Sequence, residues 1–200
     1  MYGFLNEDLK VTILAAVLLV ILALPMIIAL GWMFRIAVRL YAKYRGKRLI
    51  VCPETHECAA VNVDAIHTAV SGAFDTPDLR LSSCTRWPER AGCGQECLQQ
   101  IEESPEGCLV KNILTRWFDG KVCAFCQQPI GEIHWIDYKP AILAPDGKSI
   151  EWGDLRPERI PALLEHARPV CFNCHIAETF RREHPELVTD RDFTGAGRLP

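Results

Sequence analysis

Two cysteine pairs of the form Cys-x2-Cys constrain this chain more than any other feature. The first pair is Cys123 and Cys126, the second is Cys171 and Cys174, and 44 residues separate them. Four thiolates delivered by two such pairs are a common ligand set of a tetrahedral structural zinc site. The sequence therefore predicts a metal site, called site one below, that is built from these four cysteines.

His175 follows the second pair directly and opens another interpretation. Cys171, Cys174 and His175 together read Cys-x-x-Cys-His, the signature at which a c-type haem is attached. Haem would leave the first pair without a role. Iron-sulfur clusters and a redox dithiol at Cys123 and Cys126 are further alternatives. We expect zinc, with haem as the alternative if the soluble domain is periplasmic.

A long apolar run near the N-terminus predicts a membrane span. Residues 11–34 contain no charged side chain. As a helix these 24 residues extend about 36 Å, which exceeds the roughly 30 Å hydrocarbon core of a bilayer. A cleavable signal peptide is the alternative, but the preceding segment carries Glu7 and Asp8 instead of a basic leader, and the run is long for a signal peptide.

The charges that flank the run predict its orientation. Six basic residues and no acidic residue follow it: Arg35, Arg39, Lys43, Arg45, Lys47 and Arg48. Cations concentrate on the cytoplasmic side of membrane helices, so we expect the C-terminal domain in the cytoplasm and residues 1–10 outside. Residues 35–48 are predicted to continue the helix along the anionic leaflet of the membrane.

The soluble region is acidic and rich in cysteine. Residues 49–200 hold 15 basic and 23 acidic side chains, a formal charge of −8. This charge disfavours nucleic acid as a partner. All ten cysteines lie in this region. Disulfides are rare in the reducing cytoplasm, so metal binding is the expected use of these thiols.

The C-terminal half resembles a treble-clef zinc finger. The resemblance lies in the order of predicted elements around Cys123, Cys126, Cys171 and Cys174: a knuckle at 120–130, strands at 132–138, 141–143 and 149–152, a helix at 157–166, and a helix that starts at the second pair. It implies that these four cysteines are the zinc ligands. The long spacer between the two pairs departs from the family pattern.

The other six cysteines suggest a second site. Strands are predicted at 48–52, 58–63 and 79–84, with a helix at 63–73. Cys93 and Cys97 are spaced to share one face of a helix. We expect Cys52, Cys84, Cys93 and Cys97 to bind a second metal ion, with Cys58, Cys108 and His56 as substitutes. An iron-sulfur cluster, or burial as small apolar side chains, is the alternative.

No catalytic motif is present, so no catalytic residue is assigned and a non-enzymatic role is expected.

The predicted class is α+β, and the segments are as follows: 1–10 outside, 11–34 transmembrane, 35–48 basic juxtamembrane helix, 49–115 first cysteine-rich subdomain, 116–182 treble-clef-like zinc-binding subdomain, and 183–200 charged tail. We expect a single-pass zinc-binding adaptor or accessory module with a protein partner in a membrane complex. The alternative is an electron-transfer protein that carries iron-sulfur clusters or haem.

Overall fold

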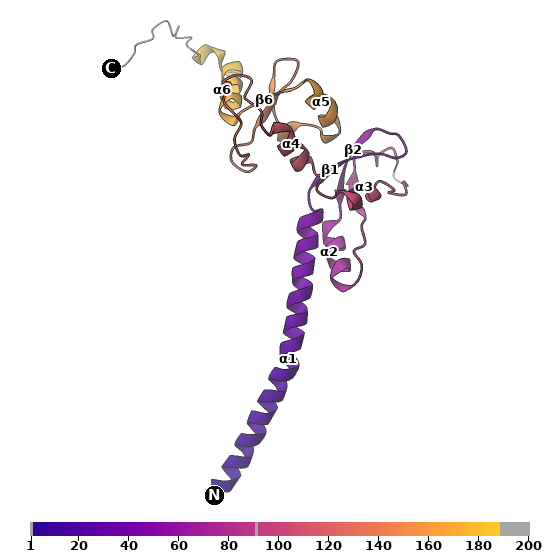
Figure 1. The fold of residues 1–200 in the computed structure, drawn as a ribbon, viewed down its shortest axis with the longest axis vertical. Coiled ribbons are helices and arrows are strands. Elements are labelled where there is room, and N and C mark those ends of the chain that lie inside the picture. The colour runs from indigo at the N-terminus through magenta and orange to yellow at the C-terminus, as the bar shows by residue number, and fades with distance from the viewer. Residues whose placement is uncertain (1, 91, 189–200) are drawn as a thin grey trace, which may run out of the picture. The chain divides into compact units, whose positions relative to one another are not determined.

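The computed structural model describes residues 2–90 and 92–188 of the chain. The chain forms two compact units, unit 1 at residues 1–109 and unit 2 at residues 110–200. Its described elements mix helices with two three-stranded antiparallel sheets, one in each unit (Figure 1). The predicted tail at 183–200 lies outside the described residues from residue 189 onward.

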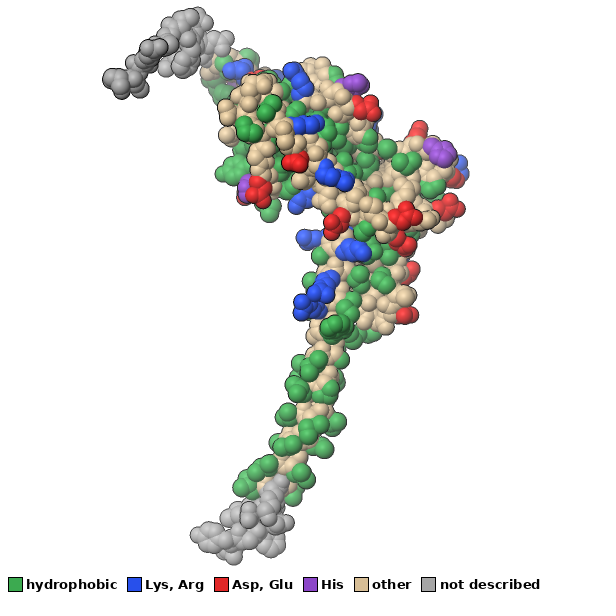
Figure 2. Space-filling model, viewed as in Figure 1, with side chains coloured by type: hydrophobic (Ala, Val, Ile, Leu, Met, Phe, Trp, Pro, Cys, Tyr) green, Lys and Arg blue, Asp and Glu red, His purple; other side chains and the backbone are tan. Residues whose placement is uncertain are grey.

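Unit 1 begins with a single long helix, α1 (Tyr2–Tyr44). Its segment Val11–Tyr44 is long and apolar enough to cross a membrane. The large side chains of the predicted span are exposed, for example Leu14 at 72% and Phe34 at 71%. Figure 2 shows hydrophobic side chains along α1 and Lys and Arg side chains toward its C-terminal end.

The end of α1 is held by a buried arginine. Arg48 is completely buried. Its guanidinium donates hydrogen bonds to the carbonyls of Lys43 and Tyr44 at 2.5 Å, of Gly46 at 3.0 Å and of Pro105 at 3.3 Å. The bonds to Lys43 and Tyr44 satisfy carbonyls at the end of α1, where the helix offers no amide partner. Burial lowers the pKa of Arg48. Of the six cations expected at the leaflet, this one is a buried helix cap instead.

The sheet of unit 1 follows the sequence prediction. Strands β1 (Lys47–Val51), β2 (Cys58–Val63) and β3 (Leu81–Cys84) pair in the order β1-β2-β3. Helix α2 (Ala65–Phe74) connects β2 to β3, and α3 (Leu98–Glu103) follows the sheet. A core of apolar side chains forms between these elements, and its members include Tyr44, Ile50, Val61, Leu81 and Ile101.

Helix α2 packs closely on α1. A Cβ atom at Gly72 would collide with the side chain of Leu40 and would lie 2.9 Å from Cγ of Pro77. The absence of a side chain at this position therefore permits the close approach of the two helices. Three large apolar side chains on α2 are exposed: Ile66, Val70 and Phe74.

Unit 2 is built around a second sheet. Helix α4 (Val110–Phe118) comes first, and then β4 (Ala141–Leu143) and β5 (Ser149–Glu151) form an antiparallel hairpin. After α5 (Ile160–His166), strand β6 (Arg168–Val170) pairs with the other edge of β4, and the last long helix is α6. Helix α6 spans Phe172–Glu183, and short 3-10 turns lie at Trp152–Asp154, Pro157–Arg159 and Pro185–Leu187.

The predicted strand at 132–138 is wrong. This segment forms a tight turn, in which the amide of Tyr138 donates to the carbonyl of His134 at 3.0 Å. Within the turn, Trp135 packs edge-on against Trp152 with ring centroids 5.1 Å apart. Ile136 and Tyr138 are exposed. Periodicity alone does not distinguish such a turn from a strand.

Candidate metal centre

The first cysteine pair lies in a hydrogen-bonded knuckle. The amide of Cys123 donates to the carbonyl of Gln128 at 2.8 Å, and the amide of Gln127 donates to the carbonyl of Cys123 at 3.0 Å. Gln127 has a φ of +58°, in the left-handed region that reverses the chain direction. This turn directs Cys123 and Cys126 toward one point.

The second pair lies where β6 passes into α6. Cys171 is the residue before the first turn of α6, and Cys174 lies within that turn. The amide of Cys171 donates to Sγ of Cys123 at 3.3 Å. The knuckle is also tied to β6, because the amide of Ala124 donates to the carbonyl of Pro169 at 2.8 Å. The two pairs are therefore joined through the backbone as well as through their sulfur atoms.

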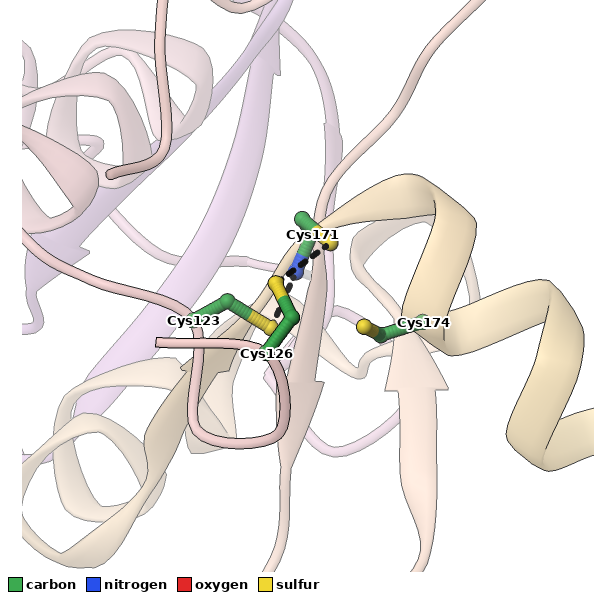
Figure 3. Close-up of side chains that lie close together, drawn as sticks. All are labelled: Cys123, Cys126, Cys171 and Cys174. Carbon is green, nitrogen blue, oxygen red and sulfur yellow. Dashed lines mark hydrogen bonds between the residues drawn. The ribbon is translucent and has the colours of Figure 1, made fainter. Parts of the chain in front are cut away.

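The four sulfur atoms of site one are close to one another. The Sγ atoms of Cys123, Cys126, Cys171 and Cys174 all lie within 4.8 Å of one another (Figure 3). The distance between Sγ of Cys126 and Sγ of Cys171 is 3.8 Å. A tetrahedral zinc ion with Zn–S bonds of about 2.3 Å requires sulfur atoms roughly 3.8 Å apart. The cluster predicted from sequence is therefore present, with spacing that suits a metal ion.

The sulfur atoms differ in their ease of ionisation. Burial alone would raise the pKa of Cys123, but the amides of Cys171, Cys126 and Phe125 donate to its sulfur and lower this pKa to about 6. Burial raises the pKa of Cys171 and of Cys174, and the neighbouring sulfurs add to the shift at Cys174. Four thiolates this close repel one another, and a bound cation would remove the repulsion.

The side chain of His175 is not a member of the four-cysteine cluster. Its Nδ1 lies 3.0 Å from Oγ of Ser149, the first residue of β5. The donor set of the cluster is thus four sulfur atoms. Such a set fits Zn²⁺ and also fits iron-sulfur clusters.

The second predicted group is less tightly assembled. Cys52, Cys84, Cys93 and Cys97 all line one cavity of about 30 Å³ in unit 1. Among the described residues, the site-one cysteines form the one group of ligand atoms that is close enough to hold a metal ion, and the four thiols of unit 1 are less tightly grouped. Burial raises the pKa of Cys97 to about 11, and the charges of Cys84, Cys93 and Cys52 contribute to this shift.

One expectation about this group is wrong. Cys93 and Cys97 do not share a helix face, because α3 begins only at Leu98 and Cys97 is the residue before it. Gln95, between the two cysteines, has a φ of +56°, which is incompatible with a right-handed helix. The two thiols reach the cavity from a loop.

The three substitutes named for this group do not line its cavity. Cys58 is the first residue of β2, and Sγ of Cys108 lies 3.6 Å from the carbonyl of Gln100. His56 is exposed on the turn before β2. All ten cysteines lie among the described residues, and none forms a disulfide.

Sequence reasoning missed a second turn of the knuckle type at Cys52. The amide of Cys52 donates to the carbonyl of Glu57 at 2.8 Å, and the amide of His56 donates to the carbonyl of Cys52 at 2.8 Å. His56 has a φ of +57°, close to the value at Gln127. The turn escaped notice because Thr55 occupies the place of the second cysteine of a Cys-x2-Cys pair.

No family model, curated protein or solved structure matches the chain. Its class is therefore defined by the structure alone. The chain is a cysteine-rich protein of mixed helix and sheet, and its described residues include one candidate membrane helix and one four-cysteine cluster suited to a metal ion.

Proposed function

We propose that the chain is a single-pass membrane protein whose cytoplasmic domain binds zinc at site one and acts as a non-enzymatic adaptor or accessory module of a membrane complex. The observation that carries this proposal is the approach of four cysteine Sγ atoms to within 4.8 Å of one another. The metal serves the fold, because structural zinc sites contribute folding free energy directly.

Zinc is favoured over haem because it uses both cysteine pairs. Haem would bond covalently to Cys171 and Cys174 and would take iron ligation from His175, leaving the first pair without a partner. In the structure both sulfurs of the second pair face the first pair (Figure 3). The amide of Cys174 in the first turn of α6 donates to the sulfur of Cys171 and so opposes the rise in the pKa of Cys171 that burial causes.

A treble-clef-like arrangement of unit 2 is part of the proposal. The order of knuckle, hairpin β4–β5 and helix α6 supports it, as does the division of the four sulfurs between the knuckle and the start of α6. The additional α5 and β6 account for the long spacer between the cysteine pairs.

Membrane insertion of α1 is supported by its exposed apolar side chains. In water such a surface is unfavourable, whereas lipid would cover it. A cleaved signal sequence is disfavoured because the C-terminal end of α1 is part of the core of unit 1, to which Tyr44 belongs and against which Leu40 packs. Arg35, Arg39 and Lys43 remain exposed at the end of α1, which supports the cytoplasmic orientation.

The proposed protein partner is supported by the exposed apolar stripe Ile66, Val70 and Phe74 on α2. This stripe lies on a helix that packs against α1, so a partner within the same membrane could reach it. A photo-crosslinker at position 70 should link to protein, and one at the exposed polar position Lys47 should not. Linkage to lipid alone would contradict a protein partner at this stripe.

Metal content and colour test the central part of the proposal. Full-length protein purified anaerobically in detergent should be colourless and contain zinc. The double variant Cys123→Ser/Cys126→Ser should contain one zinc ion fewer, whereas Cys58→Ser should retain the full amount. A Soret band would indicate haem, and broad visible absorption with stoichiometric iron would indicate an iron-sulfur cluster. Either result would overturn the zinc assignment.

Orientation is tested separately. A protease-sensitive tag after residue 200 should be protected in sealed cells and cleaved after the membrane is opened. Cleavage of the tag in sealed cells would place the soluble domain on the outer side. That result would restore the conditions under which disulfides and c-type haem form.

A further inference from the structure

We propose that Cys52, Cys84, Cys93 and Cys97 form a second zinc site, called site two, which is independent of site one. The four thiols line one cavity of about 30 Å³. The cavity reaches the core of unit 1, and its other walls include Ile50, Ala59, Leu81 and Trp87. The geometry thus brings four sulfurs from four places in the sequence to one small space.

The first argument is the turn at Cys52. Its two backbone hydrogen bonds and its left-handed residue repeat, position for position, those of the knuckle in site one. The amides of Glu54 and Thr55 also donate to the sulfur of Cys52, as those of Phe125 and Cys126 do to Cys123. A turn that directs two amides at a sulfur stabilises a thiolate, the form that binds metal.

The second argument is the source of the other three ligands. Because Thr55 replaces the second cysteine of the knuckle, this turn supplies only one sulfur. Cys84 ends β3, Cys97 directly precedes α3, and Cys93 lies on the loop between them. Cys97 is only 7% exposed and interacts electrostatically with the other three cysteines. Together they complete the four sulfurs of a Cys₄ site.

The third argument is the character of the cavity. A space of at least about 10–15 Å³ is needed to hold one water molecule, and this cavity is larger. Its lining consists of the four thiols, of apolar side chains and of the charged residues Glu54, Arg86 and Arg90. Thiols that served only as apolar filling would be expected to close such a space. Movement of the four sulfurs onto one ion would close it.

Charged side chains also line the cavity. A zinc ion with four thiolates has a net charge of −2, and Arg86 and Arg90 line the cavity together with Glu54, which pairs with Arg90 at 3.3 Å. Arg86 also pairs with Glu57 at 2.6 Å, and its Nε is buried without a hydrogen-bond partner in the described part of the chain. A zinc-bound thiolate would be an acceptor for such a donor.

Zinc stoichiometry of the full-length protein tests site two. The wild type should contain two zinc ions per chain, and Cys84→Ser/Cys93→Ser and Cys123→Ser/Cys126→Ser should each contain one. The matched control Cys58→Ser should retain two. One zinc ion in the wild type, unchanged by Cys84→Ser/Cys93→Ser, would overturn site two and leave site one intact. If the wild type held one zinc ion and only Cys84→Ser/Cys93→Ser lost it, site one would be overturned instead.

A measurement on the unmodified chain covers the case in which the double variant fails to fold. Zinc-loaded and chelator-treated wild type are alkylated with iodoacetamide, and the modified residues are identified by mass spectrometry. Removal of zinc should increase alkylation at Cys52, Cys84, Cys93 and Cys97 as well as at the site-one cysteines, with little change at Cys58. An increase confined to the site-one cysteines would contradict site two.

Discussion

The two units use similar turns around cysteine but assemble their thiols to different degrees. In unit 2 the four sulfurs lie within 4.8 Å of one another, whereas in unit 1 four thiols border a cavity. Unit 2 obtains two sulfurs from one knuckle and two from one helix turn. Unit 1 draws on separate segments, so its thiols meet only when the tertiary fold brings those segments together. Local spacing therefore organises site one, while site two depends on packing.

The apolar clusters next to the two groups of cysteines also differ. Unit 1 has a cluster of large buried side chains that includes Tyr44, Ile50 and Ile101. The cluster next to site one consists of Cys123, Ala141, Leu143 and Val170. Unit 2 also buries large side chains elsewhere, among them Leu114, Phe118, Ile142 and Ile160. Because the cluster next to site one holds few large side chains, we expect the segments around site one to depend on the proposed metal ion.

The largest expected effect follows from removing a site-one ligand. Cys174→Ser should remove most of the zinc-dependent stability of unit 2, on the order of 10 kcal/mol by analogy with zinc-finger peptides. Hydrogen exchange measured by mass spectrometry should show loss of protection in β4 and β6, with β1 and β2 unchanged. Equal loss in both units would contradict the difference between them, and full protection in the variant would show that site one does not stabilise unit 2.

The next effect concerns the buried arginine of unit 1. Arg48→Met should lower the free energy of unfolding by about 2–3 kcal/mol, because buried carbonyls at the end of α1 lose a charged donor. Urea unfolding followed by hydrogen exchange in β1 measures this change. The matched control is Arg45→Met at an exposed position, where we expect a change within about 0.5 kcal/mol. Similar values for the two variants would refute the capping role of Arg48.

A smaller effect sharpens the comparison of the two turns. His56 and Gln127 have nearly equal positive φ angles, +57° and +58°. Replacement of either residue by glycine should relieve backbone strain and stabilise its unit by about 0.5 kcal/mol, after allowance for the greater freedom of glycine in the unfolded chain. Stabilisation of only one unit, measured by thermal unfolding of the zinc-loaded variants, would show that the turns are not equivalent.

The smallest effect belongs to the start of α2. Hydrogen bonds from the amide of His67 and from Arg80 lower the pKa of Asp64 from its ordinary value of 3.8. The carboxylate therefore contributes stability above that value, and the contribution is lost as the pH falls through the lowered pKa. Wild type and Asp64→Asn should differ slightly in unfolding free energy at neutral pH and converge in acid. A difference that persists in acid would contradict this assignment.

The sequence predicted the elements with strong periodicity or a clear boundary signal. The helix over the apolar run, the strands at 48–52 and 58–63, and the cluster of Cys123, Cys126, Cys171 and Cys174 are present in the structure. Only two residues separate the cysteines within each pair, so their proximity follows from the spacing. Only the approach of the two pairs to each other had to be inferred.

The remaining features depend on tertiary contacts that spacing does not encode. The segment 132–138 alternates like a strand but forms a turn, within which Trp135 packs on Trp152. Cys93 and Cys97 have helical spacing, yet the left-handed backbone at Gln95 separates them from α3. Arg48 resembles the other cations that follow the apolar run, and only the fold reveals that carbonyls surround its guanidinium.

The ligand shell of the zinc ion proposed for site one provides the most direct test of the central claim. Zinc X-ray absorption should be measured on Cys84→Ser/Cys93→Ser, in which site one is the remaining proposed site. The account predicts one zinc ion with a single shell of four sulfur atoms at about 2.3 Å. A shell containing nitrogen or oxygen, or a centre that holds iron in place of zinc, would contradict a zinc site made by Cys123, Cys126, Cys171 and Cys174.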